Sequence, residues 1–211
     1  IISHEFKNEL CVIQNAVYFL GMKLQNGDEK IKKQIKLLTE EIAETGRMID
    51  NIASFAKNRF LEIKPVNLEA LLISAIKKAQ IPDTINVLAK IEKDLPPVKA
   101  DEIQLARVFN NIILNSLQAM TEKGSLIIKA IRLDNGVNIV FEDTGSGIKE
   151  EDTKKIFDPF FSTKNKGMGL GLVASKVIIE AHNGSIDITN NKTGKGAMVT
   201  IQLPIKERKN A

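Results

Sequence analysis

The sequence predicts an α+β protein of two domains, a helical hairpin at residues 1–60 followed by a sandwich of helices and strands at residues 61–211. Two patterns indicate this division. Through the first part, apolar residues recur every three or four positions, which is typical of helices that pack along a narrow seam. After Pro65 the chain turns to short β-like runs separated by helical patterns, as expected where helices and a sheet share one core.

The composition excludes several classes of protein. Charged residues make up 27% of the chain and hydrophobic residues 43%, and no apolar run approaches the ~18 residues of a membrane helix. The net charge is only +4, with lysines dispersed among acidic residues, so we expect no nucleic-acid surface. The single cysteine, Cys11, cannot form an internal disulfide and fits a reducing compartment, which favours the cytoplasm.

The hairpin is predicted from two apolar seams joined by a turn. The seams comprise Leu10, Ile13, Val17, Leu20 and Leu24 in the first helix, and Ile31, Ile35, Leu38, Ile42, Ile49, Ile52 and Phe55 in the second. Asn26 and Gly27 favour the turn, and Asp28 can cap the second helix. Because a second copy would bury such seams best, we expect a homodimer held by an antiparallel four-helix bundle.

The second part alternates strand and helix patterns. Strands are expected within the stretches "TINVLAKIE", "GSLIIKAIRL", "GVNIVFED" and "AMVTIQLP". Helices are expected at Asp101–Met120, Glu150–Phe157 and Gly171–His182. Together these elements predict a mixed sheet that packs against helices in a single core.

Two asparagines in "NNIILNSLQAM" are the first candidates for ligand binding. Asn111 and Asn115 lie four residues apart and therefore share one helix face. Their amide oxygens could ligate a hard cation, and their amide nitrogens could reach phosphate oxygens. They could also be two surface residues, but asparagine is a poor helix former, and its repeated use between aliphatic residues calls for a reason.

The stretch "FEDTGSGI" is the second candidate. A strand ends in Asp143, and Gly145 and Gly147 let the backbone approach a ligand closely. The carboxylate could accept a hydrogen bond from an exocyclic amine such as that of adenine. The alternative role of Asp143 is to cap the turn.

The third candidate is "FFSTKNKGMGLGL", a glycine-rich segment that leads into a helix. Lys164 and Lys166 precede Gly167, Gly169 and Gly171. Backbone amides at the start of the helix and a nearby lysine can hold phosphates, while the glycines allow close approach and a hinge for a lid. A tight turn would explain a lone loop of this kind equally well.

The three motifs in this order resemble the N, G1 and G2 boxes of the histidine-kinase and gyrase-type ATPase fold, and "IFDPFFSTK" is similar to its F box. The resemblance implies an α/β sandwich that binds ATP and Mg²⁺, with Asp143 on the adenine, Asn115 as the magnesium ligand and Asn111 near the phosphates. The other nucleotide-binding positions that it implies are Gly145, Gly147, Thr163, Lys164, Gly167, Gly169, Leu170 and Gly171.

The N-terminal "ISHEFKNEL" resembles the H box of sensor histidine kinases. The resemblance implies that His4 takes the phosphoryl group from ATP, with Glu5 accepting the imidazole proton, and passes it to an aspartate of a response-regulator receiver domain. The spacing of Glu5 and Asn8 resembles the family's phosphatase motif, in which Asn8 would orient a water molecule. We therefore expect the cytoplasmic core of a larger kinase whose sensor or membrane segment precedes this chain.

Two other functions stay open. The chain could be an ATPase or a Ser/Thr kinase of the same nucleotide-binding fold, with the hairpin only a dimeriser and His4 incidental. It could also be an interaction module with a degenerate ATP site. The intact Asn115, Asp143 and glycine boxes argue against the second, and the His4–Glu5 pair at the start of the hairpin argues against the first.

Overall fold

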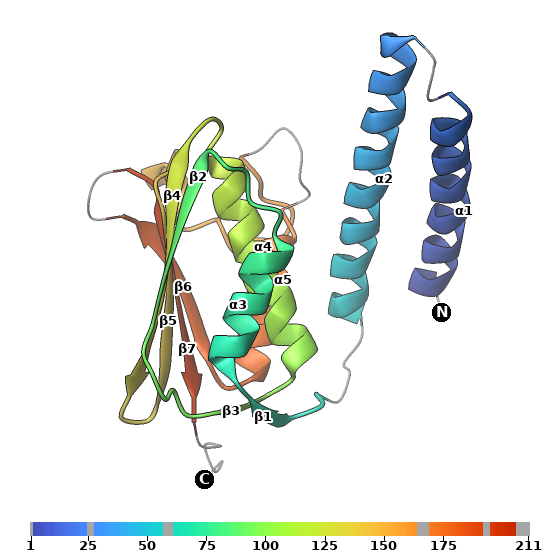
Figure 1. Cartoon of the computed structure of the whole chain (residues 1–211). Coiled ribbons are helices and arrows are strands. Elements are labelled where there is room, and N and C mark those ends of the chain that lie inside the picture. The colour runs from blue at the N-terminus through green and yellow to red at the C-terminus, as the bar shows by residue number, and fades with distance from the viewer. Residues whose placement is uncertain (1, 25–27, 57–60, 164–168, 192–194, 206–211) are drawn as a thin grey trace. The chain divides into compact units, whose positions relative to one another are not determined.

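The computed structural model describes residues 2–24, 28–56, 61–163, 169–191 and 195–205 (Figure 1). Within the described helices, the side chains of residues 2–7, 43, 44 and 47–56 lie outside the description. The chain forms two compact units, Ile1–Arg59 and Phe60–Ala211. No helix in the described ranges is long and apolar enough to cross a bilayer.

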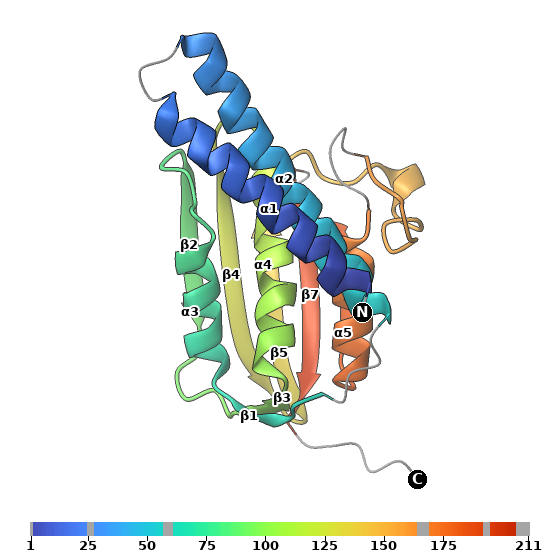
Figure 2. The same ribbon diagram turned by 90° about the vertical axis from the view of Figure 1, so that its right-hand side faces the viewer.

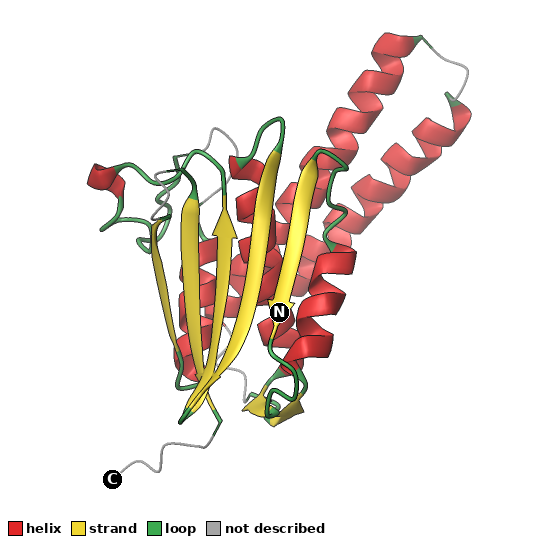
Figure 3. Cartoon of the chain, turned by 60° about the vertical axis from the view of Figure 1, so that its left-hand side comes forward, coloured by secondary structure: helices red, strands yellow, loops and turns green. Residues whose placement is uncertain are grey.

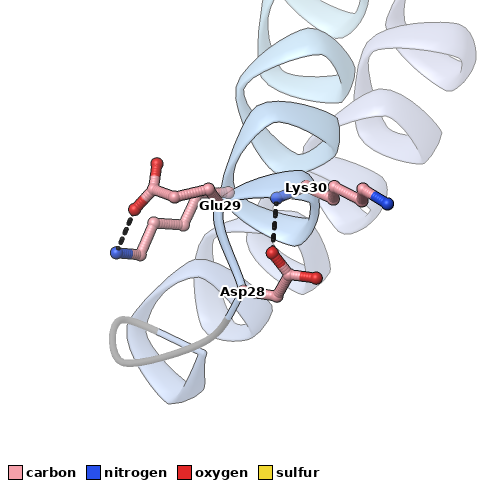
Figure 4. A network of polar contacts seen from close by, with 4 residues as sticks. Asp28, Glu29 and Lys30 are labelled. Atoms are coloured by element: carbon pink, nitrogen blue, oxygen red, sulfur yellow. Dashed lines mark hydrogen bonds and ion pairs between the residues drawn. The ribbon is translucent and has the colours of Figure 1, made fainter.

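The first unit is a hairpin of α1 (Ile2–Lys23) and α2 (Glu29–Ala56), which lie side by side (Figure 1). The predicted cap at Asp28 is confirmed, because its Oδ1 accepts the Lys30 N–H at 3.1 Å (Figure 4). Glu29 pairs with Lys32 at 2.9 Å in the same turn. Both helices are continuous, α1 through Glu9 and α2 through Gly46.

The apolar seams of the hairpin are only partly covered within one chain. Val17 is buried, and Leu10, Leu24, Ile35 and Ile42 are half-buried. The remaining described seam positions stay between 41% and 50% exposed, namely Ile13, Leu20, Ile31 and Leu38. Further exposed apolar side chains of this unit are Val12, Tyr18, Phe19, Met22 and Leu37. The hairpin therefore presents more apolar surface than its own two helices can bury.

The second unit is a sheet covered on one face by helices. Its strand order is β2 (Ile85–Ile91), β4 (Gly124–Leu133), β5 (Gly136–Asp143), β7 (Ala197–Pro204) and β6 (Ser185–Asn190). The pair β2–β4 is parallel and the other pairs are antiparallel. Three helices lie side by side on the sheet, α3 (Leu68–Lys78), α4 (Glu102–Ala119) and α5 (Gly171–Ala181) (Figure 2). In Figure 3 the opposite face, turned to the viewer, carries no helix among the described residues.

The core lies between the sheet and the three helices. Alternate residues of β5 are buried, as the period of two along a strand requires. Phe141 of this strand meets Phe109 of α4, with ring centroids 5.9 Å apart. A separate two-stranded antiparallel sheet is formed by β1 (Lys64–Val66) and β3 (Val98–Ala100). This core fixes α4 and the end of β5, which carry two of the three motifs.

Most expected elements of this unit are confirmed, and one is wrong. The four expected strands form, but α3, β6 and the small sheet were not predicted. The helix expected at Glu150–Phe157 is a single 3₁₀ turn, Glu150–Asp152, followed by turns. The segment has only Ile156 and Phe157 as apolar residues, so it offers no apolar stripe for a helix to bury.

The second histidine of the chain, His182, joins two helices. It is 4% exposed, and its Nε2 accepts the Asp101 N–H at 2.9 Å. Its Nδ1 lies 2.7 Å from the Ile178 carbonyl oxygen, so the ring proton resides on Nδ1. Asp101 caps α4 through the Gln104 N–H, at 3.1 Å. His182 thus links the start of α4 to the end of α5 and has no nitrogen left for a reaction.

Candidate functional site

Asp143 is the last residue of β5, and its carboxylate is held in place by the backbone. The side chain is 4% exposed. Its Oδ1 accepts the Gly145 N–H at 2.9 Å and the Ala197 N–H at 3.0 Å. Two such bonds offset the cost of burying the charge and fix the carboxylate plane. Because both bonds go to Oδ1, Oδ2 is the oxygen that a ligand amine can use.

The loop after Asp143 uses its glycines to pack against the protein. A Cβ at Gly145 would lie 2.6 Å from the Ala119 Cβ at the end of α4. The Ser146 N–H donates to the Ala119 carbonyl oxygen at 3.2 Å. These contacts explain the glycine at 145 without a ligand, and its close approach to a nucleotide stays a prediction.

Gly147 adopts a left-handed conformation, with φ +71°, which favours glycine. The next residue, Ile148, is clamped by the Asn190 side chain. Asn190 Oδ1 accepts the Ile148 N–H and its Nδ2 donates to the Ile148 carbonyl oxygen, both at 2.7 Å. The loop is therefore tied to β6 on one side and to α4 on the other.

The support of Asp143 by the start of β7 was not predicted from the sequence. Gly196 has φ +85°, and a Cβ there would collide with the Asp143 carbonyl oxygen. Only glycine lets β7 approach closely enough for the Ala197 N–H to reach the carboxylate. Gly196 in the stretch "GKGAMV" was a local signal, but nothing near it in the sequence connects this stretch with Asp143, which lies 54 positions before Ala197.

The two asparagines lie in the middle of α4, one turn apart and both half-buried. Asn111 Nδ2 donates to Ser175 Oγ at 3.0 Å, and Ser175 Oγ donates to the Gly171 carbonyl oxygen at 3.0 Å. A Cβ at Gly171 would collide with Asn111 Oδ1, so this glycine allows the close contact of α4 with α5. Ser175 is a site residue that the sequence did not indicate.

Helix α5 begins at Gly171 without a side-chain cap, whereas Asn67 caps α3 and Asp101 caps α4. Leu170 is 5% exposed, and Gly169, with φ +64°, packs against the Phe161 carbonyl group. The backbone amides of the first turn of α5 are therefore not engaged by a capping side chain and can bind an anion.

The structure brings the predicted nucleotide motifs together around α4. Asn111 contacts the start of α5, and the loop of Gly145 packs on Ala119 at the end of the same helix. Thr163 is exposed in the loop before α5, while Lys164 and Gly167 lie outside the described residues.

Helix α1 contains the three predicted residues of the hairpin, His4, Glu5 and Asn8. The Asn8 side chain is exposed, and the side chains of His4 and Glu5 lie outside the description.

These residues fit a nucleotide and one metal ion. The free oxygen of the buried Asp143 carboxylate suits an exocyclic amine. No cluster of three or more His, Cys, Asp or Glu side chains suited to a metal occurs in the part of the chain that the structure describes. Magnesium at nucleotide sites commonly takes one or two protein ligands, with phosphates and water completing its shell, so a single amide oxygen such as that of Asn115 suits it.

The fold and its gathered motifs define a sandwich of the ATPase type attached to a helical hairpin. Residues 100–207 match the family described as "Histidine kinase-, DNA gyrase B-, and HSP90-like ATPase". The chain belongs to this family, which confirms the resemblance predicted from the N, G1 and G2 motifs.

The similarity to sensor kinases extends over the hairpin as well. The signal transduction histidine-protein kinase AtoS of Escherichia coli (strain K12) is 32% identical over 213 residues, which cover 99% of this chain and 34% of AtoS. The chain thus spans about a third of the length of that relative.

Two solved structures share the fold. Full-length ShkA in complex with AMPPNP has a TM-score of 0.74 at 24% identity, over 96% of this chain and 44% of that one. Histidine kinase ThkA in complex with response regulator TrrA has a TM-score of 0.70 at 24% identity, over 99% of this chain and 62% of that one.

Proposed function

We propose that this chain is the catalytic core of a sensor histidine kinase, which binds ATP in the sandwich and phosphorylates His4. The observation that supports this most is the buried Asp143 carboxylate at the end of β5, which is held at Oδ1 by two backbone amides. It stands in a chain that is similar to histidine kinase AtoS over 99% of its length. ATP is a cytoplasmic metabolite, so the active compartment is the cytoplasm.

Each part of the nucleotide has a partner in this proposal. Asp143 Oδ2 accepts a hydrogen bond from the adenine amine. The backbone amides at the start of α5 bind phosphate oxygens, with Lys164 and Thr163 contributing from the preceding loop and Asn111 nearby. The glycines at 145, 147, 167, 169 and 171, with Leu170, shape the loops around these groups. Asn115 holds magnesium, which supplies positive charge to offset that of the phosphates.

The chemical step is an in-line transfer. An imidazole nitrogen of His4 attacks the terminal phosphorus of ATP, a P–N bond forms, the P–O bond to ADP breaks, and ADP leaves. Glu5 accepts the imidazole proton. The phosphohistidine then passes its phosphoryl group to an aspartate carboxylate of a response-regulator receiver domain, the partner class named for ThkA.

The stability of the label tests this reading. Protein incubated with γ-labelled ATP and magnesium should carry a label that survives alkali and is lost in acid, as a P–N bond requires. A label that survives acid but not alkali would indicate a Ser/Thr kinase instead. Release of inorganic phosphate without any protein label would indicate an ATPase.

The hairpin is proposed to dimerise through its uncovered apolar side chains. The exposed seam residues include Ile13 and Leu20 of α1 and Leu38 of α2. A second hairpin would cover them in a four-helix bundle. Analytical ultracentrifugation of the chain should give twice the monomer mass of 23.4 kDa at micromolar concentration. A monomer at that concentration contradicts the proposal.

Asn8 is proposed to serve the reverse reaction, the hydrolysis of regulator phosphate. Its amide can orient a water molecule in line with the phosphorus of a docked phosphoaspartate, which is a positioning role without proton transfer. We expect Asn8→Ala to slow dephosphorylation of the regulator by about tenfold or more, at least ~1.4 kcal/mol of barrier. Labelling of His4 should stay within several-fold of the parent.

The decay of phosphorylated regulator, followed with parent and variant protein, measures this effect. Asn15→Ala is a matched control, because Asn15 is another exposed asparagine of α1. Equal decay rates for the parent and the Asn8→Ala protein would reduce Asn8 to an ordinary surface residue.

A further inference from the structure

We infer that Ser175 is a positioning residue of the nucleotide site, which acts through Asn111 to hold the phosphate-binding turn of α5 against α4. The inference rests on the proposed function and adds to it a residue outside the recognised motifs. Its basis is a chain of two hydrogen bonds, from Asn111 Nδ2 to Ser175 Oγ and from Ser175 Oγ to the Gly171 carbonyl oxygen, each 3.0 Å long.

The hydroxyl of Ser175 has both of its roles assigned. A serine inside a helix often donates to the carbonyl group four residues earlier, and the bond to Gly171 is of this kind. The bond from Asn111 is different, because it joins residues 64 positions apart on two helices. Ser175 is only 2% exposed, so water cannot readily replace either partner.

These contacts also fix the orientation of the Asn111 amide. Nδ2 is directed to Ser175, and Oδ1 lies so close to the Cα of Gly171 that a Cβ there would collide with it. Without the Ser175 oxygen, the half-buried amide of Asn111 loses the acceptor that holds it in this orientation.

The consequence concerns phosphates more than adenine. Gly171 opens α5, whose first backbone amides are proposed to bind phosphate, and Asn115, the proposed magnesium ligand, lies one turn after Asn111 on α4. The link between Asn111 and Ser175 therefore sets the spacing between the phosphate site and the metal ligand.

The adenine side of the site is supported differently. Asp143 is held by the Gly145 and Ala197 amides, which do not depend on Ser175.

Ser175→Ala tests the inference with little risk to the fold, since alanine fits the space and is the strongest helix former. We expect it to weaken binding of magnesium-ATP by about tenfold, which corresponds to ~1.4 kcal/mol. Binding of adenosine, measured by ligand-observed NMR, should stay within twofold of the parent. Ser116→Ala, which removes the hydroxyl of an equally buried serine on α4, should leave the ratio of the two affinities unchanged.

A double-mutant cycle separates positioning from general stability. If Ser175 acts through Asn111, adding Ser175→Ala to Asn111→Ala should change magnesium-ATP affinity by no more than twofold. A further tenfold loss in the double variant, or an equal loss of ATP and adenosine binding in Ser175→Ala, would overturn the inference. An unchanged ratio of magnesium-ATP to adenosine affinity in Ser175→Ala would also overturn the inference. The proposed function would then remain intact. A parent protein that binds neither ligand would instead refute the proposed function.

Discussion

Replacement of His4 by glutamine is expected to reduce labelling by ATP and magnesium to background while leaving ATP affinity within about twofold. Glutamine has a polar side chain of similar length but lacks a nucleophilic ring nitrogen, so no P–N bond can form. The nucleotide-binding residues belong to the other compact unit, Phe60–Ala211, so the substitution should not disturb them. Scintillation counting of the labelled protein and calorimetric titration with ATP measure the two effects.

The environment of the other histidine, His182, supports the assignment of the phosphoryl group to His4. Both ring nitrogens of His182 are engaged, with the Asp101 N–H and the Ile178 carbonyl oxygen, and the side chain is buried. Mass spectrometry should therefore find the phosphoryl group on the peptide that contains residue 4. Asn15→Ala, on the same helix, should label like the parent. Stable labelling of the His4→Gln protein on a serine or threonine would favour a Ser/Thr kinase.

The strands and motifs could be predicted because their signals are local. The alternation of apolar residues along β4, β5 and β7 marked strands, and the spacing of Asn111 and Asn115 marked a shared helix face. In contrast, β6 has the short and mostly polar sequence "SIDITN", whose two buried isoleucines acquire meaning only beside β7. The period of a strand is visible in the sequence, but the neighbour that covers it is not.

The glycines show a second limit. Their spacing predicted loops around a ligand, but the structure also uses Gly145, Gly169 and Gly171 for contacts with Ala119, Phe161 and Asn111. The residues that support the site were missed for the same reason. Ser175 and Ala197 reach Asn111 and Asp143 across 64 and 54 positions of the chain. Such contacts arise only when α5 and β7 are packed in place.

The Asp143→Asn variant is expected to weaken ATP binding by about 1–3 kcal/mol, a factor of ~5–150, which is the scale of a lost hydrogen bond to a charged group. The substitution is isosteric, and the asparagine Oδ1 can still accept the Gly145 and Ala197 N–H groups, so the loop should keep its conformation. Nδ2 then replaces Oδ2 and presents a donor to the adenine amine, which is itself a donor. The loss is therefore one of complementarity and not of structure.

The preference for ATP over GTP should also be weaker in the Asp143→Asn variant. Guanine carries a carbonyl oxygen where adenine carries its amine, so the Asp143 carboxylate of the parent should repel GTP, whereas the amide of the variant can donate to it. We expect the ATP-to-GTP affinity ratio, measured by calorimetry, to be large in the parent and to narrow in Asp143→Asn. Asp187→Asn, at an exposed aspartate of β6, should leave the ratio unchanged. Equal affinities for ATP and GTP in the parent protein would rule out adenine recognition by Asp143.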